Sequence, residues 1–146
     1  MNSDSLEPVR IYSNVRAKPE KVFDAWLDPK SIGQWMFKPW DDKIIKIKTD
    51  GFPDTEFSFL VERAGEKINH VGTYIEVRRP HRLVFTWGVG NSPMGDSRVS
   101  IDFEPNGEDT YMTLTHRGVD AEYKNRTQEG WDKIIASLQS AMTEHK

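Results

Sequence analysis

The C-terminal residues 127–146 carry their apolar side chains at the spacing of an amphipathic helix. At about 100° per residue these side chains lie within an arc of about 120°, the width of a core-facing stripe. Thr127 is expected to cap the first turn, because its hydroxyl can accept a backbone N–H. A helix of about 18 residues is roughly 27 Å long and needs an apolar surface of similar length. The stripe consists of Trp131, Ile134, Ile135, Leu138, Ala141 and Met142.

The N-terminal part predicts one strand followed by two short helices. Residues 7–16 alternate between apolar and polar side chains, as a half-buried strand does. Pro19 suits the first position of a helix, and Asp28 followed by Pro29 forms the cap and first position of a second one. The apolar positions are Val9, Ile11 and Val15 on the strand, Val22, Phe23, Trp26 and Leu27 on the first helix, and Ile32, Trp35 and Met36 on the second.

From residue 44 onward the spacing is that of strands. Asn106-Gly107 predicts a hairpin with a type I′ turn, because both central positions of such a turn need positive φ. Residues 120–126 are polar and predict a loop. About seven strands and a long terminal helix predict an α+β fold, in which a curved antiparallel sheet packs against that helix. The runs after the first strand are 44–48, 55–62, 69–79, 82–89, 97–105 and 109–117.

Composition narrows the class of protein. The 146 residues predict a single domain, 1–146, and the lack of cysteine excludes disulfides, thiolate catalysis and cysteine-bound zinc. Twenty Lys and Arg are interspersed with 23 Asp and Glu, so no nucleic-acid partner is expected. The start of the chain lacks the features of a secretory signal, and no apolar run is long enough for a membrane span. We therefore expect a cytoplasmic protein, with its oligomeric state open.

Several short segments together form a recognisable pattern. They are residues 18–26, Trp35, Gly72-Thr73-Tyr74, Pro80-His81-Arg82-Leu83, Phe85-Thr86-Trp87, Leu114-Thr115-His116 and Gly130-Trp131. The pattern resembles one known family, the homologues of the activator of the 90-kDa heat-shock-protein ATPase. This family belongs to the START-like helix-grip superfamily, also called SRPBCC or birch-pollen-allergen-like. The resemblance covers about residues 8–143 and implies a helix-grip fold, a sheet curled around the C-terminal helix that leaves an elongated apolar cavity.

The first functional hypothesis is non-enzymatic binding of a small hydrophobic ligand between sheet and helix. One helix stripe covers the many large side chains of the strands only with very tight packing, and otherwise a void remains. Apolar walls would supply affinity at about 25 cal/mol per Å² buried, and Tyr74 or His116 would orient the ligand. The predicted ligand-binding residues are Trp35, Phe59, Tyr74, Phe85, Trp87, Phe103, Met112, His116, Trp131 and Ile135.

Five positions keep alternative interpretations. His116 is either a core histidine bonded to backbone or a neighbouring tyrosine, or a ligand contact or base within the cavity. The aromatic residues at 35, 37 and 40 either form a pocket mouth or pack beneath the helix pair. Gly130 costs its helix about 1 kcal/mol relative to alanine. Close approach to the facing strand explains this glycine, and so does space for a ligand beside Trp131.

Two other functions remain as hypotheses. The resemblance implies a co-chaperone that activates a heat-shock chaperone ATPase; it ranks second because such activators carry an additional N-terminal domain. The third is a cavity enzyme of the cyclase or hydratase type, with His116 as base. No activated nucleophile is recognisable. His70, His81 and His145 lie on separate elements, so the sequence predicts no metal, no cofactor and no defined catalytic residue.

Overall fold

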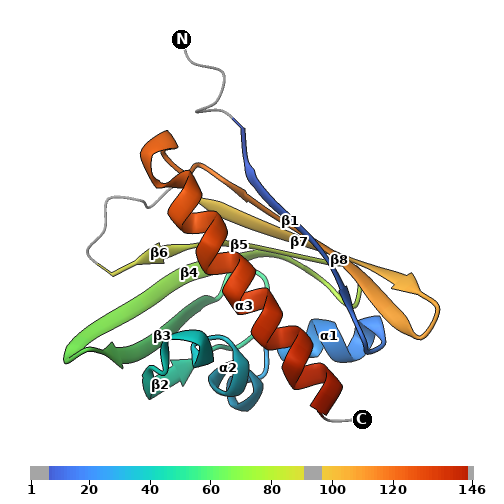
Figure 1. The fold of residues 1–146 in the computed structure, drawn as a ribbon, viewed down its shortest axis with the longest axis horizontal. Coiled ribbons are helices and arrows are strands. Elements are labelled where there is room, and N and C mark those ends of the chain that lie inside the picture. The colour runs from blue at the N-terminus through green and yellow to red at the C-terminus, as the bar shows by residue number, and fades with distance from the viewer. Residues whose placement is uncertain (1–6, 91–96, 145–146) are drawn as a thin grey trace.

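The computed structural model describes residues 7–90 and 97–144 as an antiparallel sheet crossed by a long helix (Figure 1). His145 and the first six residues, both used in the sequence interpretation, lie outside the described residues. The predicted α+β helix-grip fold is confirmed. The elements are β1 Val9–Val15, α1 Pro19–Ala25, α2 Pro29–Trp35, η2 Lys38–Trp40, β2 Lys43–Lys48, β3 Glu56–Arg63, β4 Glu66–Arg78, β5 Arg82–Thr86, β6 Gly88–Val89, β7 Arg98–Asn106, β8 Asp109–Arg117, η3 Ala121–Tyr123 and α3 Lys124–Glu144.

The strands form one eight-stranded sheet in the order β1-β8-β7-β5-β4-β3-β2, and β6 pairs with β4. The first strand β1 pairs with the last strand β8 along its whole length, from Val9 opposite His116 to Val15 opposite Thr110. The other edge strand, β2, exposes Lys43, Lys46 and Lys48. Lysines on an edge strand hinder pairing with another chain, because each ammonium group would have to lose its water.

Helix α3 packs its predicted apolar stripe on the concave face of the sheet (Figure 1). Its buried residues reach from Trp131, 3% exposed, to Met142, 5% exposed. The helix begins at Lys124, so the predicted cap at Thr127 and the predicted loop at 120–126 are wrong. The turn η3 explains the difference: Tyr123 donates its backbone N–H to Asp120 (2.9 Å), and the chain continues directly into α3.

The helices α1 and α2 close one end of the sheet beneath the C-terminal part of α3 (Figure 1). Asp28 caps α2 as predicted, since its carboxylate accepts the N–H of Ser31 at 3.1 Å. The Trp35 indole donates to the carbonyl of Ala25 at 3.2 Å, which ties the two helices together. Phe23 of α1 packs edge-on against Phe103 of β7, with ring centroids 5.3 Å apart. Aromatic packing therefore fills this end.

The long strand β4 changes the face it presents partway along its length. A register shift between Tyr74 and Glu76 breaks the alternation predicted for residues 69–79. Before the shift His70 and Tyr74 are buried, whereas Ile75 is 37% exposed. A bulge of this kind adds one residue to one strand, so side chains beyond it swap faces.

The predicted strand 82–89 is divided into β5 and β6, with Trp87 between them. The Trp87 N–H donates to the carbonyl of Ser97 at 3.1 Å, and the Ser97 hydroxyl donates to the Trp87 carbonyl. Both backbone groups of Trp87 are therefore bonded to Ser97 rather than within a regular strand pair. The Trp87 ring lies over the concave face against Trp131, with ring centroids 5.4 Å apart.

Two hairpin turns show how local sequence fixes the strand register. The hairpin between β7 and β8 is confirmed, but Asn106 pairs with Asp109, so the central residues are Gly107 and Glu108. Of these two central residues only Gly107 has positive φ (64°), as in a type II′ turn. The predicted type I′ turn is therefore wrong. Ala64 and Gly65 join β3 to β4 with positive φ at both positions, as in a type I′ turn.

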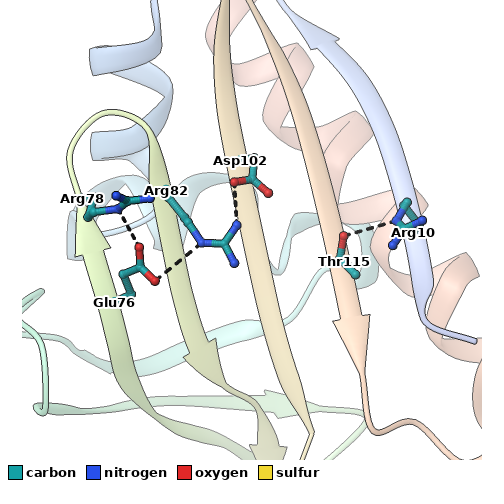
Figure 2. A network of polar contacts seen from close by, with 6 residues as sticks. All are labelled: Arg10, Glu76, Arg78, Arg82, Asp102 and Thr115. Carbon is teal, nitrogen blue, oxygen red and sulfur yellow. Dashed lines mark hydrogen bonds and ion pairs between the residues drawn. The ribbon is translucent and has the colours of Figure 1, made fainter. Parts of the chain in front are cut away.

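The face of the sheet turned away from α3 carries a network of polar contacts (Figure 2). Arg82 lies between Asp102, at 2.7 Å, and Glu76, at 3.6 Å, and Glu76 also pairs with Arg78. Such partly exposed ion pairs contribute only about 0 to 1 kcal/mol each. The stability of the fold therefore depends on the concave side, where the apolar side chains gather.

At Gly72 of β4 the neighbouring residues leave no room for a Cβ atom, and replacing this glycine by alanine should destabilise the protein. A Cβ at this position would overlap with the Thr86 carbonyl oxygen and the Phe57 ring. Overpacking of this kind costs typically about 1 to 3 kcal/mol. We expect Gly72→Ala to lower the free energy of unfolding in urea by at least that amount.

Gly90→Ala is the matched control, because the nearest described atom to its new Cβ is the Asn69 carbonyl oxygen at 3.7 Å. Its free energy of unfolding should stay within about 0.5 kcal/mol of the wild type. Equal stabilities of the two variants would contradict the close approach at Gly72.

Candidate ligand-binding site

A cavity of about 250 Å³ lies between the N-terminal half of α3, the turn η2 and the concave face of the sheet. We refer to it as the α3 cavity. Its walls come from six regions of the chain: η2 and the residue before it, β3, β4, the β5–β6 region, β8, and α3. The lining residues are Phe37, Trp40, Arg63, His70, Trp87, Gly88, Val89, His116, Thr127, Gly130, Trp131 and Ile134.

Aromatic rings in mutual contact form most of the wall. The ring centroid of His70 lies 4.9 Å from that of Phe37 and 5.4 Å from that of Trp87. Trp131 continues the series, 5.4 Å from Trp87 and 6.0 Å from His116. Aromatic side chains give a rigid apolar surface with few rotatable bonds. The α3 cavity therefore has walls of defined shape.

An ion pair fixes η2 to β3 at the edge of the cavity. Arg63 donates two hydrogen bonds to the Asp42 carboxylate, at 2.7 and 2.6 Å, and the side chain of Asp42 is fully buried. The Arg63 guanidinium also lies 4.6 Å from the centroid of the Trp40 ring. Such a bidentate pair with a cation–π contact holds both side chains in one geometry. Trp40 is thereby held as a cavity wall.

His116 is bonded to Trp131 rather than to backbone or tyrosine. The Trp131 indole N–H donates to Nδ1 of His116 at 3.0 Å. Indole nitrogen is only a donor, so Nδ1 carries no hydrogen and the hydrogen of the neutral ring is on Nε2. Nε2 is buried and has no hydrogen-bond partner among the described residues. Burial lowers the pKa of His116 to about 4, so the ring is neutral at physiological pH.

His70 has the opposite tautomer. Its Nδ1 lies 3.2 Å from the carbonyl oxygen of Phe59, which can only accept a hydrogen bond. Nδ1 therefore carries the hydrogen, and Nε2 has a free lone pair for an N–H or O–H group. Burial is the main cause that lowers the pKa of His70. The cavity wall thus contains two neutral imidazoles, one with its hydrogen on Nε2 and one with its hydrogen on Nδ1.

Gly130 faces the cavity, and close approach to a strand does not explain it. The one described atom within 4 Å of a Cβ built there is Cζ2 of Trp40, at 4.0 Å. Trp40 belongs to η2, not to the sheet, and that distance is ordinary van der Waals contact. The strand-packing interpretation of Gly130 is therefore wrong. The missing side chain leaves room beside Trp131.

The structure separates the ten predicted ligand-binding residues into three groups. Trp87, His116 and Trp131 line the α3 cavity. Phe59, Tyr74 and Phe85, again with Trp87, border a second void of about 10 Å³, which has room for at most one water. The remaining four, Trp35, Phe103, Met112 and Ile135, lie in the packed core, each at most 3% exposed.

Tyr74 and Trp35 have structural partners. The Tyr74 hydroxyl is hydrogen-bonded to the Thr49 hydroxyl at 2.6 Å, and burial raises its pKa to about 12. Its polar end is thus directed at β2 and the loop that follows. Trp35 packs against Trp26 beneath the helix pair, so the packing alternative holds for this residue. Phe37 and Trp40 line the cavity, so the pocket alternative holds for these two.

Sequence reasoning missed several residues of the wall. The bulge in β4 obscured His70, although its two-residue spacing from Gly72 and Tyr74 was a usable signal. Nothing in the sequence pointed to Arg63, whose position depends on its tertiary bond to Asp42. The sequence predicts Thr127 as a helix cap. The helix instead begins at Lys124, and Thr127 lines the cavity.

The described part of the chain brings no group of three His, Asp or Glu side chains together as metal ligands. None of its helices has the length and apolar character needed to cross a membrane.

Solved structures share this fold at low sequence identity. A protein from Chromobacterium violaceum is 20% identical, with a TM-score of 0.79, covering 93% of this chain and 96% of that one. A Mycobacterium smegmatis protein is 18% identical, with a TM-score of 0.82 and coverages of 99% and 96%. An AHSA1-like protein from Aeromonas hydrophila is 20% identical, with a TM-score of 0.77 and coverages of 93% and 92%. A search of curated protein sequences finds no match.

The family profile matches a larger part of the chain than the segments that carried the resemblance. The profile described as "Activator of Hsp90 ATPase homolog 1-like protein" matches residues 16–143. This range extends from the end of β1 to the last turn of α3 and includes every described residue that lines the α3 cavity. The chain therefore belongs to the Activator of Hsp90 ATPase homolog 1-like protein family, as its sequence resemblance implied.

Proposed function

We propose that this protein binds a small, mainly apolar molecule in the α3 cavity without transforming it. The observation that carries the proposal is a space of about 250 Å³ lined mainly by aromatic rings. His116 in its wall has a buried Nε2 without a hydrogen-bond partner among the described residues. Ligand sites are typically concave, mostly apolar and furnished with a few polar groups that set orientation. The α3 cavity has all three properties.

The expected affinity is moderate. Burying about 200 Å² of apolar surface would contribute on the order of 5 kcal/mol at about 25 cal/mol per Å². Loss of translational and rotational freedom opposes binding, while preformed walls reduce the cost of ordering side chains. The apolar contribution limits the binding free energy to about −5 kcal/mol, so a dissociation constant of about 0.2 mM or weaker follows for a ligand of one or two rings.

Catalysis with His116 as base is disfavoured by its hydrogen bonding. Its Nδ1 lone pair accepts the Trp131 N–H, and its Nε2 already carries the hydrogen. Burial lowers the pKa to about 4, and no carboxylate in the described part of the chain raises it. A general base needs a free lone pair and a pKa near the working pH. The co-chaperone alternative is supported by the family description only, so ligand binding ranks first.

Gly130→Ala provides the direct test of the cavity. The added methyl group should raise the free energy of unfolding by about 1 kcal/mol, because alanine favours the helix. The same methyl group projects beside Trp131 and Trp40 into the cavity. It should therefore weaken binding of 2-naphthol, used as a two-ring probe ligand, about tenfold through overpacking. Urea unfolding measures the stability, and isothermal titration calorimetry measures the affinity.

Gly33→Ala is the control for the Gly130 substitution, because Gly33 lies in α2 and has no described neighbour within 4 Å of its new Cβ. This variant should gain similar stability and retain the wild-type affinity. If Gly130→Ala bound 2-naphthol as tightly as Gly33→Ala does, the ligand would not occupy the α3 cavity.

The pKa of His116 predicts a pH dependence of stability. The folded pKa of about 4 lies below the ordinary value of 6.5, so the unfolded chain binds a proton that the folded chain does not. Stability from the neutral ring is complete above pH 6.5 and is lost as pH falls to about 4, by on the order of 3 kcal/mol. His116→Gln removes this titrating group.

Urea unfolding of wild type and His116→Gln between about pH 7 and pH 4 checks this expectation, and the wild type should lose more stability. The comparison cancels His70, whose pKa burial also lowers but which is present in both proteins. Nuclear magnetic resonance of the His116 ring nitrogens reports the pKa directly. A His116 titration near 6.5 would contradict the buried neutral ring.

A further inference from the structure

We infer that the α3 cavity selects uncharged ring compounds that carry a hydrogen-bond donor, a phenolic O–H or an indole-type N–H, and that Nε2 of His70 accepts this donor. The inference rests on the proposed binding function and adds the recognising atom and the chemical class of the ligand. Three properties of the cavity carry it: the tautomer of His70, the access to its Nε2 and the pairing of the one charged side chain in the described wall.

A backbone carbonyl fixes which nitrogen of His70 carries the hydrogen. Nδ1 lies 3.2 Å from the carbonyl oxygen of Phe59, which can only accept a hydrogen bond. Nδ1 is therefore the donor, and Nε2 of the neutral ring has a lone pair and no hydrogen. Burial lowers the pKa of His70, which keeps the ring in this neutral form. His70 consequently offers a ligand an acceptor and no donor.

Nε2 of His70 is accessible, in contrast to Nε2 of His116. Neither atom has a hydrogen-bond partner among the described residues, but only the atom of His116 is sealed from solvent. The His70 ring lines the cavity between Phe37 and Trp87, with ring centroids 4.9 and 5.4 Å away. These two rings and the bond to the Phe59 carbonyl hold the imidazole in one orientation. A ligand in the cavity can therefore reach its accessible nitrogen.

The lone pair on Nε2 discriminates between ligands of the same shape. Water can bond to this nitrogen until a ligand covers it, and an acceptor that is then buried without a donor is destabilising. An O–H or N–H group of the ligand restores the bond. A hydrocarbon leaves the lone pair unpaired, and an ether oxygen places a second lone pair against it. Ligands that donate a hydrogen bond should therefore bind more tightly.

The charged group in the wall does not favour a charged ligand. Arg63 is the one charged side chain among the described lining residues, and its Nε and Nη2 donate to the two carboxylate oxygens of Asp42. A carboxylate bound at Arg63 would lie near the fully buried carboxylate of Asp42, and like charges repel. An ammonium group would face the Arg63 cation and no anion among the described lining residues.

The walls set the size of the ligand. Three of the five tryptophans of the chain, Trp40, Trp87 and Trp131, line the cavity, and Phe37 adds a fourth apolar ring. Aromatic rings pack offset or edge-to-face on one another, which suits a planar ligand. The volume of about 250 Å³ lies just below the usual range of about 300 to 1,000 Å³ for drug-sized ligands. One or two fused rings therefore fit.

Three bicyclic probes test the inference: indole, benzofuran and benzofuran-2-carboxylate. Indole and benzofuran have nearly the same shape, but benzofuran has an oxygen in place of the indole N–H. Calorimetric titration of the wild-type protein should show indole binding about tenfold more tightly than benzofuran, equivalent to one hydrogen bond of about 1.4 kcal/mol. Benzofuran-2-carboxylate should bind more weakly than indole.

Two variants assign the preference to His70. His70→Leu removes the acceptor, so indole and benzofuran should bind with equal affinity. His81→Leu is the matched control, because His81 is exposed between β4 and β5 and does not line the cavity. It should keep the wild-type affinity for indole and the tenfold preference of about 1.4 kcal/mol.

Nuclear magnetic resonance of the wild-type protein tests the same contact without a substitution. Indole should shift the Nε2 signal of His70 as that nitrogen accepts a hydrogen bond, and it should leave the signal of Nδ1 nearly unchanged. Benzofuran should not produce the hydrogen-bonded shift at Nε2. This measurement decides the matter if His70→Leu does not fold.

The opposite outcomes separate the inference from the function on which it rests. If none of the three probes binds, the proposed function and this inference are both wrong. If benzofuran binds as tightly as indole, or if folded His70→Leu still prefers indole, the inference is wrong and the binding function stands. Tightest binding of benzofuran-2-carboxylate would also overturn the inference, because Arg63 would then be the recognising group.

Discussion

The rest of the structure depends on burial of the apolar stripe of α3 against the concave face of the sheet. Trp131 is the central residue of this contact. Its ring centroid lies 6.3 Å from that of Trp26 on the core side and 5.4 Å from that of Trp87 on the cavity side, and its N–H bonds to His116. One side chain therefore joins the helix to β8, to the region between β5 and β6 and to the residue that follows α1. Both the core and the α3 cavity are built around it.

The two ends beneath α3 differ because different elements cover them. At one end α1 and α2 insert Phe23 and Trp35 next to the sheet and fill the core, so that the groove of about 700 Å³ at this end lies outside these helices. At the other end the covering element is η2, three residues long, whose Trp40 lies 4.6 Å from Arg63 of β3. So short an element cannot supply a second layer of side chains. The cavity is therefore a consequence of topology, and Gly130 on the facing helix widens it.

The sequence predicted the fold better than the site, and the difference has a physical cause. Alternation and helical periodicity are local, so the strands and the α3 stripe could be located from spacing alone. Phe103 and Met112 face inward as expected, yet whether an inward residue meets a cavity or a neighbour depends on contacts distant in sequence. Phe23 covers Phe103, for example, across 80 positions of the chain. The bulge at Tyr74 hid His70 in the same way, since it depends on pairing with β5.

Two departures from optimal stability meet in the α3 cavity. Gly130 lowers the helix propensity of α3, although no described backbone atom approaches closely enough to require a glycine. His116 keeps a buried N–H unpaired, although an apolar side chain of similar size would avoid that cost. The two residues lie on different elements, α3 and β8, and neither cost compensates the other. Departures of this kind are expected where a protein keeps space and hydrogen-bonding capacity for something other than itself. Their coincidence at one ring-lined cavity supports the proposed binding function over packing as the reason for both residues.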